Sequence, residues 1–392
     1  MKRLFFLIVP AVILFGCAGD EPLAPQMTTD LLWVDPYSAG RPELRVMTWN
    51  IYVGTDVDMV LSATDEMDLI TKVAAAYEMF AQTSFHERAR AIATQIGKER
   101  PDLIGLQEVS LIQRFVPNNG KMALAEQLDF LQILLNALQE RGLDYRLADS
   151  VRNANVTVPR LVEMSGSTPV VDYVNLIDAD AILVRGDVAT WGTIKGRYQA
   201  ALPVPAPVFE VPRGYVSVAA MVGNKTYRFV ATHLESFIEA VRLPQAQELC
   251  ATFAWETLPL IIVGDFNTLD PTPPNPYADA IYQYMTIMAG FEDVWVHNLK
   301  RNKGAGYTSP FAADLMDPVP NLVERIDLIL VRNYGPPAGQ NLIGPVQAEV
   351  IGDNPKDRTP SGLWPSDHAG VVARLHMADP TPMAQTNFIP LQ

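Results

Sequence analysis

The feature of this sequence that most limits its possible folds is a series of short apolar runs, several of which stop abruptly at a polar side chain. Runs of this length, rich in Val, Ile, Leu and aromatic residues, are typical of strands buried in a sheet. Because a polar residue at the end of a run can bind a metal or transfer a proton, we expect chemistry at strand ends. The runs are Leu44–Asn50, Asp102–Val109, Ala179–Arg185, Tyr215–Val222, Lys225–Leu234, Leu258–Asp265, Arg325–Arg332 and Gly370–His376.

Helical spacing of apolar residues lies between these runs, so strands and helices are interleaved. Gly223-Asn224 separates two runs and predicts a two-residue turn, which makes at least one sheet locally antiparallel. No repeat or composition shift follows Pro42, and we expect one domain at residues 43–378 with a C-terminal tail at 379–392. The helical segments are His86–Glu99, Ala125–Arg141, Phe237–Thr257 and Tyr277–Ala289.

The N-terminus has the pattern of an export signal. Two basic residues precede an apolar run that is too short to span a bilayer, and Leu14-Phe15-Gly16-Cys17 is similar to a bacterial lipobox. We expect a lipoprotein signal peptide at residues 1–16, a lipid on Cys17 and a flexible tether at 17–42. The protein is then exported and anchored to a membrane, at the periplasmic face or the cell surface. The alternative is an ordinary signal peptide in which Cys17 is incidental.

The first three strand ends each carry one polar residue of interest. Asn50 ends its run, where an isolated Asn is usually a turn former. Glu108 follows a nearly continuous apolar strand, and a buried carboxylate needs a partner such as a divalent cation. His233 closes a strand, a place where a single His is more often structural than catalytic.

The remaining strand ends carry four acids or amides and a second histidine. Asp265 and Asn267 follow Gly264 at i, i+2 spacing, which aims both side chains the same way if the chain stays extended. Asp327 lies inside an apolar run. Asp367 and His368 precede the last strand and point in different directions, so one can bind a metal while the other contacts a substrate.

Taken together and in order, these motifs resemble those of the endonuclease/exonuclease/phosphatase superfamily, which has the deoxyribonuclease I-like fold. The family also includes bacterial sphingomyelinases and inositol polyphosphate phosphatases. The resemblance covers residues 44 to 376 and implies an α/β fold, a four-layer sandwich of two packed mixed β-sheets flanked by helices. The motifs are Thr-Trp-Asn50-Ile, Leu-Gln-Glu108-Val, Thr-His233-Leu, Gly-Asp265-Phe-Asn267, Arg-Ile-Asp327 and Ser-Asp367-His368.

The resemblance also implies a metal and a division of roles. Mg²⁺, with Mn²⁺ as an alternative, suits the oxygen-rich set of Asn50, Glu108 and Asp367 better than zinc does. The implied reaction is an in-line attack of water on phosphorus. In it Asp265 orients or deprotonates the water, while Asn267 and His233 bind phosphate oxygens. The resemblance further implies that His368 contacts the phosphate or assists proton transfer and that Asp327 holds it.

Two segments depart from the family pattern. Asp178-Ala-Asp180 stands where many members have Gly or Asn. Because of this departure, the family's additional phosphate-contacting Tyr or Arg cannot be matched directly to a residue of this chain; Tyr173 and Arg213 are candidates. Residues 52–85 exceed a minimal connection and form either an acidic helical lid or a solvated surface helix.

Three functions remain open from the sequence. The first is a metal-dependent phosphodiesterase or phosphatase acting outside the cytoplasm, with a phospholipid head group, an inositol phosphate or a nucleic acid as substrate. The second is a secreted or surface-anchored nuclease, which the net charge of −14 weakens because phosphate contacts by Lys and Arg supply most non-specific affinity. The third is a non-catalytic binding module, which the complete motif set opposes. No protein partner can be inferred.

Overall fold

The computed structural model describes residues 43–201, 211–268, 279–300, 303–332 and 346–377. All of them belong to one compact unit, Pro36–Gln392. The expected signal peptide (1–16), tether (17–42), lipidated Cys17 and C-terminal tail (379–392) lie outside the described residues, so these boundaries stay predictions. Within the described ranges, none of the helices has the length and apolarity needed to cross a membrane.

The larger sheet is built around the first strand of the domain. Its strands are β1 (Leu44–Asn50), β2 (Leu103–Gln107), β3 (Leu111–Asn118), β4 (Lys121–Asp129), β5 (Tyr145–Ser165), β6 (Thr168–Arg185), β13 (Gln347–Ile351) and β14 (Gly370–Leu375). They run in the order β13-β14-β1-β2-β6-β3-β4, and β5 pairs with β6. Because β1 pairs parallel with β2 and antiparallel with β14, the sheet is mixed.

The smaller sheet holds the other strand ends of interest. Its strands are β7 (Ala189–Arg197), β8 (Gly214–Val222), β9 (Lys225–His233), β10 (Leu260–Asp265), β11 (Glu292–Asp293) and β12 (Asp327–Arg332). They run in the order β11-β12-β10-β9-β8-β7, with β9 and β10 parallel. The expected turn is confirmed, since Val222 pairs with Lys225 across Gly223, which has φ 60°.

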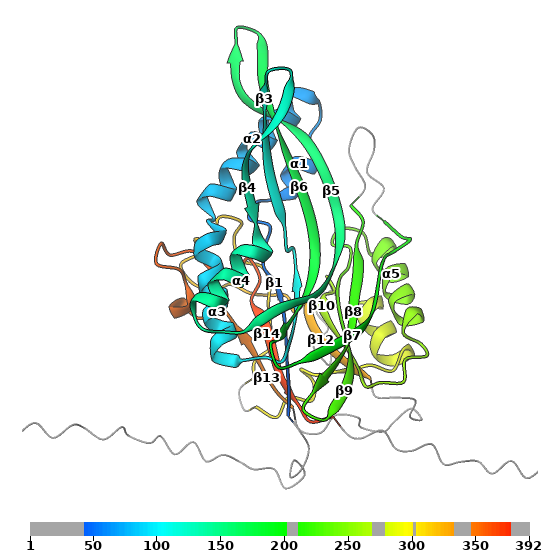
Figure 1. Ribbon diagram of the computed structural model, residues 1–392. Coiled ribbons are helices and arrows are strands. Elements are labelled where there is room, and N and C mark those ends of the chain that lie inside the picture. Colours follow the sequence, from blue (N-terminus) through cyan, green and yellow to red (C-terminus); the bar gives the residue numbers. More distant parts are fainter. Residues whose placement is uncertain (1–42, 202–210, 269–278, 301–302, 333–345, 378–392) are drawn as a thin grey trace, which may run out of the picture. The chain divides into compact units, whose positions relative to one another are not determined.

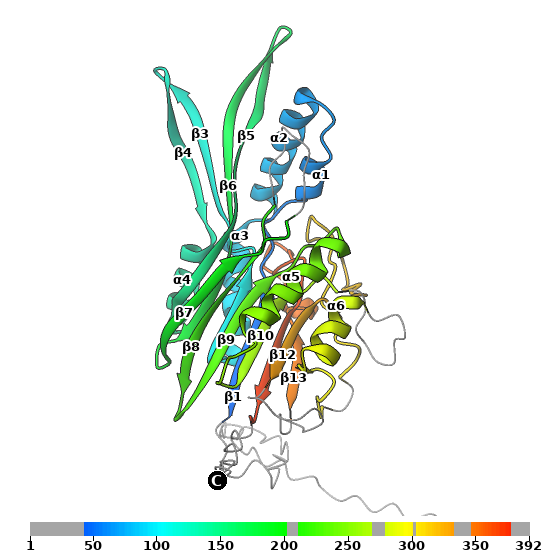
Figure 2. The same ribbon diagram turned by 90° about the vertical axis from the view of Figure 1, so that its right-hand side faces the viewer.

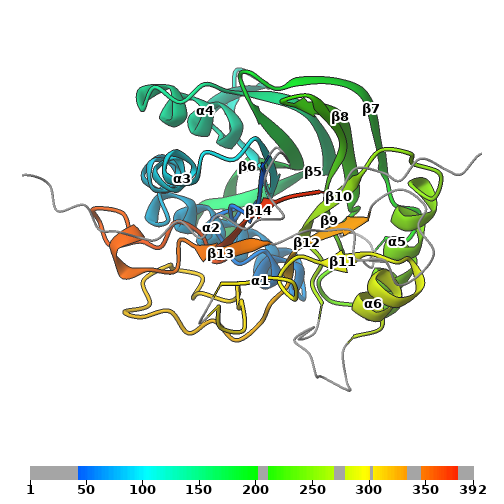
Figure 3. The ribbon, with the colours of Figure 1, turned by 90° about the horizontal axis from the view of Figure 1, so that it is seen from below.

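Helices cover the outer face of each sheet, as Figure 3 shows. The larger sheet carries α2 (Glu66–Gln82), α3 (Phe85–Glu99) and α4 (Phe130–Glu140), and the short α1 (Val57–Leu61) precedes them. The smaller sheet carries α5 (Glu239–Thr252), α6 (Ala280–Gln283) and a π-helical turn at Tyr284–Met288. A 3₁₀ turn lies at Pro355–Asp357.

Three apolar clusters fill the spaces between these layers. Successive residues of β1 face opposite sides of their sheet, so Met47 packs under the helices while Val46 packs against the second sheet. A strand with both faces buried reads as a continuous apolar run, which is why the sequence shows such runs. The predicted four-layer α/β sandwich of two mixed sheets is therefore confirmed. Cys250 lies buried on α5 and forms no disulfide among the described residues.

The structure differs from the sequence prediction at two long hairpins. Figures 1 and 2 show β3–β4 and β5–β6 projecting at one end of the larger sheet. The expected helix Ala125–Arg141 begins only at Phe130, because residues 121–129 pair with β3 along their whole length. Cross-strand pairing thus overrides local helical spacing there.

Candidate active site

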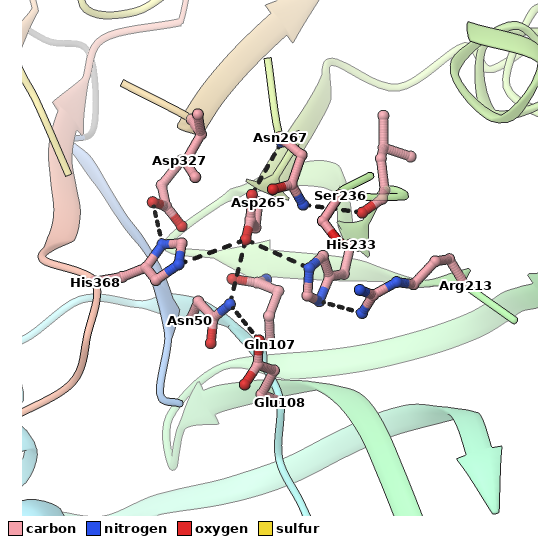
Figure 4. A network of polar contacts seen from close by, with 12 residues as sticks. Asn50, Gln107, Glu108, Arg213, His233, Ser236, Asp265, Asn267, Asp327 and His368 are labelled. Atoms are coloured by element: carbon pink, nitrogen blue, oxygen red, sulfur yellow. Dashed lines mark hydrogen bonds and ion pairs between the residues drawn. The ribbon is translucent and has the colours of Figure 1, made fainter. Parts of the chain in front are cut away.

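The six motifs of the sequence converge at one end of the two sheets, as Figure 4 shows. In the smaller sheet, Asp265 at the end of β10 pairs with His233 on β9 and with Asp327 on β12. Three polar side chains are thereby fixed side by side by strand register. The larger sheet contributes its own strand ends, with Asn50 ending β1, Glu108 following β2 and His368 preceding β14.

Gly264 permits this close arrangement. Its φ is +155°, and a Cβ at this position would collide with the carbonyl oxygen of Thr232 on the neighbouring strand. Only glycine fits without moving the backbone that places Asp265 and His233 next to each other.

Asp265 lies at the centre of the site. Its Oδ2 lies 3.2 Å from Asn50 Nδ2, 3.4 Å from His233 Nε2 and 3.9 Å from His368 Nε2. Its Oδ1 accepts from the backbone N–H of Asn267 at 3.0 Å. Burial and the neighbouring charge of Asp327 raise the pKa of Asp265 to about 6. A carboxylate with such a pKa is a suitable proton acceptor near neutral pH.

His233 is a neutral imidazole of one defined tautomer. Arg213 lies 3.0 Å from its Nδ1, and a guanidinium only donates hydrogen bonds, so Nδ1 is the acceptor and Nε2 carries the proton. Burial and the positive charges of Arg213 and His368 hold the pKa of His233 well below its usual value. The Nε2–H group therefore points toward Asp265.

His368, unlike the neutral His233, carries a positive charge. Its Nδ1 lies 2.9 Å from Asp327 Oδ2, which is the contact through which Asp327 is expected to act. Burial alone would lower the pKa of His368, but the surrounding carboxylates of Asp327, Asp367 and Asp265 outweigh it and raise the pKa well above the usual value. Asp265 thus lies between a neutral and a cationic imidazole.

The expected metal ligands lie beside this group. Asn50 Nδ2 donates to Glu108 Oε1 at 2.8 Å, and Glu108 Oε2 accepts from the backbone of Val53 at 2.7 Å. Burial and the nearby Asp178 raise the pKa of Glu108, and burial raises that of Asp367 to about 7. In this arrangement Asn50 turns its amide nitrogen toward Glu108, and its Oδ1 accepts from Tyr52 N.

These residues fit a hard divalent cation. The raised pKa values of Glu108 and Asp367 indicate that the surrounding protein does not fully stabilise the charged form of these buried carboxylates. Oxygen donors of this kind suit Mg²⁺ or Mn²⁺. Asp327 Oδ1 is buried without a hydrogen-bond partner among the described residues. Ligand atoms of Asp265, Asp327 and His368 also lie within 4.8 Å of one another. A cationic His368 has no lone pair for a metal, so this second group fits a cation only when the imidazole is neutral.

Arg88 on α3 is a positioning residue that the sequence analysis missed. It is fully buried and donates to the backbone carbonyls of Ile51, Tyr52 and Pro365, which flank Asn50 and Asp367. A buried arginine bound to carbonyls of distant loops leaves no local sequence signal beyond its place on the buried face of an expected helix.

The two candidates for an additional phosphate contact, Arg213 and Tyr173, differ in their position relative to the site. Arg213 borders the site and contacts His233. Tyr173 lies on the β6 part of the long hairpin, is 36% exposed and pairs with Pro159 and Phe115. It does not reach the site.

The site opens into a cavity of about 380 Å³. One end holds Arg213, His233, Asp265 and His368. The other end is apolar and is formed by α1, α2 and the β5–β6 hairpin. Residues 52–85, expected as an acidic helical lid or a solvated surface helix, contain the helices α1 and α2, and apolar residues of both line this cavity.

Fold and site together define a deoxyribonuclease I-like sandwich with the acids, amides and histidines of phosphoester hydrolysis at its strand ends. Residues 47–368 match the model of the Endonuclease/Exonuclease/phosphatase family, and the chain belongs to this family. The predicted family resemblance is therefore confirmed. A search of curated proteins finds no match.

Several solved structures of low identity are similar to this chain, and the two with TM-scores of 0.50 or above share its fold. A family protein from Bacteroides thetaiotaomicron is 15% identical, with 86% of this chain and 99% of that one covered and a TM-score of 0.52. A family protein from Leptotrichia buccalis is 16% identical, with coverage of 85% and 99% and a TM-score of 0.50. A mannosyl-6-phosphatase from B. thetaiotaomicron is 17% identical, with the same coverage and a TM-score of 0.49.

Proposed function

We propose that this protein is a phosphoester hydrolase that needs a divalent metal, Mg²⁺ or Mn²⁺, and acts outside the cytoplasm. The observation that carries the proposal is the position of Asp265 between a neutral His233 and a cationic His368. This arrangement places a proton acceptor beside a proton donor, which hydrolysis of a phosphoester by water requires.

The side chains divide the work as follows. Asp265 orients the attacking water and accepts its proton. The Nε2–H of His233 and the amide of Asn267 bind phosphate oxygens. One N–H of that amide donates to the Leu234 carbonyl at 3.0 Å, and the second, which has no partner among the described residues, can donate to the substrate. His368 donates a proton or a hydrogen bond to the phosphate, while Asp327 fixes its ring. The cation, held by Asn50, Glu108 and Asp367, would neutralise charge on the phosphate and the leaving group.

The charges around the site argue against a nuclease. Among the described residues that line the cavity, Arg213 is the single arginine and no lysine occurs, whereas Asp56, Asp58 and Asp178 are acidic. A polyanionic strand needs repeated cationic contacts along its backbone. A binding module without catalysis does not account for one neutral and one cationic imidazole around a single buried acid.

We expect hydrolysis of a simple phosphoester to require added metal. Removing the metal leaves Glu108 and Asp367 as uncompensated buried acids, so turnover should cease in excess chelator and return with Mg²⁺ or Mn²⁺. The measurement is release of p-nitrophenol from mono- and diester substrates. Glu108→Gln should raise the metal concentration needed for half-maximal rate, with Glu163→Gln, an exposed position on β5, as control. Full activity in excess chelator would contradict the proposal.

We further propose that the enzyme works at a membrane surface, tethered by a lipid on Cys17. The support is the lipobox-like Leu14-Phe15-Gly16-Cys17 at the end of an export signal. Cys17→Ser should move the protein from the membrane fraction to the soluble fraction, and metabolic labelling with a radioactive fatty acid should be lost. Cys250→Ser is the matched control and should retain both. A wild-type chain that takes up no label would contradict the anchor.

A further inference from the structure

Two apolar surfaces meet at the cavity and account for its composition. On α2, Val73, Ala76, Tyr77 and Phe80 follow i, i+3, i+4, i+7 spacing and form one stripe. All four line the cavity. Figure 2 shows this helix beside the β5–β6 hairpin.

The hairpin presents its own apolar face to the same space. Val156 pairs with Leu176 and Val158 pairs with Val174, so these four side chains share one face, and all of them line the cavity. On the opposite face of this stretch, the polar side chain of Asn175 donates to Asn155 and Thr157. The hairpin therefore has a defined inner, apolar side.

The space between these walls is continuous with the catalytic groups. The same cavity of about 380 Å³ is lined by Val73 and Val158 at one end and by Asp265 and His233 at the other. This volume lies in the range of small-molecule sites. A phosphate bound by His233 and Asn267 thus leaves the rest of the substrate to lie against apolar side chains.

We propose that the substrate is an amphiphilic phosphoester, in which a single phosphate carries an extended apolar group that occupies the space between α2 and the β5–β6 hairpin. This inference rests on the proposed hydrolase function. The acidic side chains of Asp56 and Asp58 at the cavity repel additional phosphates, which disfavours polyphosphorylated substrates. Apolar walls offer no partners for sugar hydroxyls, so a small polar phosphoester would leave its hydroxyls unpaired.

The test compares esters that differ only in chain length. Two series, alkyl monophosphates and alkyl p-nitrophenyl phosphate diesters with methyl, butyl and octyl chains, are given to the full chain with Mg²⁺, below their micelle concentrations. In the series that is hydrolysed, kcat/KM should rise by up to about fourfold for each buried methylene. A further comparison of the benzyl ester with the hexyl ester shows whether the cavity prefers an aromatic or an aliphatic group.

The variants fill the space from either wall. Ala76→Phe on α2 and Val158→Phe on the hairpin should bring the octyl-to-methyl ratio of kcat/KM close to one. Ala75→Phe is the matched control, because Ala75 is exposed on the same helix and lies outside the cavity lining; it should keep the wild-type ratio. Thermal unfolding checks that each variant is folded, and the ratio is internal to each protein.

The outcomes separate this inference from the proposed function. Equal kcat/KM for all chain lengths, or an octyl preference that survives both filling variants, overturns the apolar subsite and leaves the hydrolase intact. If no ester is hydrolysed, calorimetric titration with octyl phosphate and methyl phosphate decides. Tighter binding of octyl phosphate, lost in Ala76→Phe, keeps the subsite and overturns the hydrolase, whereas equal binding overturns both.

Discussion

Asp265→Asn is expected to lower kcat by about 10²–10⁴-fold with little change in KM, since a positioned general base is commonly worth that factor. The amide keeps the size of the side chain and its hydrogen bond from the Asn267 backbone. It cannot accept a proton from water. The measurement is steady-state kinetics on the best phosphoester substrate under saturating metal.

The control for this substitution is the same change at an exposed acid. Asp187 forms a surface ion pair with Arg185, so Asp187→Asn should leave both kcat and KM unchanged. A folded Asp265→Asn enzyme with near-normal turnover would remove Asp265 from the catalytic set.

His368→Ala is expected to lower turnover strongly, and adding Asp327→Asn to it should change little further. Asp327 lies 2.9 Å from His368 Nδ1, so its contribution passes through that ring. Alone, Asp327→Asn should cost ~10–100-fold, as is typical when the residue that orients a functional imidazole is lost. Residues that act as one unit are not additive. The measurement is kcat/KM for both single variants and the double variant.

A second double-mutant cycle, of Asn267 and His368, provides a comparison pair that we expect to act independently. Asn267 contacts Leu234 and Asp265 through its amide and backbone but not His368 among the described contacts. The fold losses in kcat/KM of Asn267→Ala and His368→Ala should therefore be closer to multiplicative than those of the first pair. Multiplicative losses in the Asp327→Asn, His368→Ala pair would show that the two residues act separately.

The sequence predicts the strands with two buried faces well, because such strands read as continuous apolar runs. Leu44–Asn50 is the same strand in prediction and structure, and Gly370–His376 differs by one residue. Of the long hairpin strands, only Ala179–Arg185 at the end of β6 was predicted, because β5 alternates small, polar and apolar residues. Its register with β6 also shifts at three places. Periods broken in this way give no clear local signal.

The residues of the candidate site could be predicted where they lie at the ends of predicted strands, and not elsewhere. The acids, amides and histidines stand at the ends of the well-predicted strands, and strand pairing brings Asp265, His233 and Asp327 together. Arg88 could not be identified, since its partners are backbone carbonyls from loops remote in sequence. The apolar cavity was missed for a related reason, because one of its walls is the unpredicted hairpin.

The central position of β1 has a consequence for how this chain folds during synthesis. Leu44–Thr48 pair with Val371–Leu375, so the first described strand is completed by the last. Closing so long a loop is slow, and a chain synthesised from its N-terminus lacks β14 until residues 370–375 have been made. The larger sheet therefore stays open beside β1 until that point. Because Asp367 and His368 lie just before β14, the candidate active site is also completed only at this late stage.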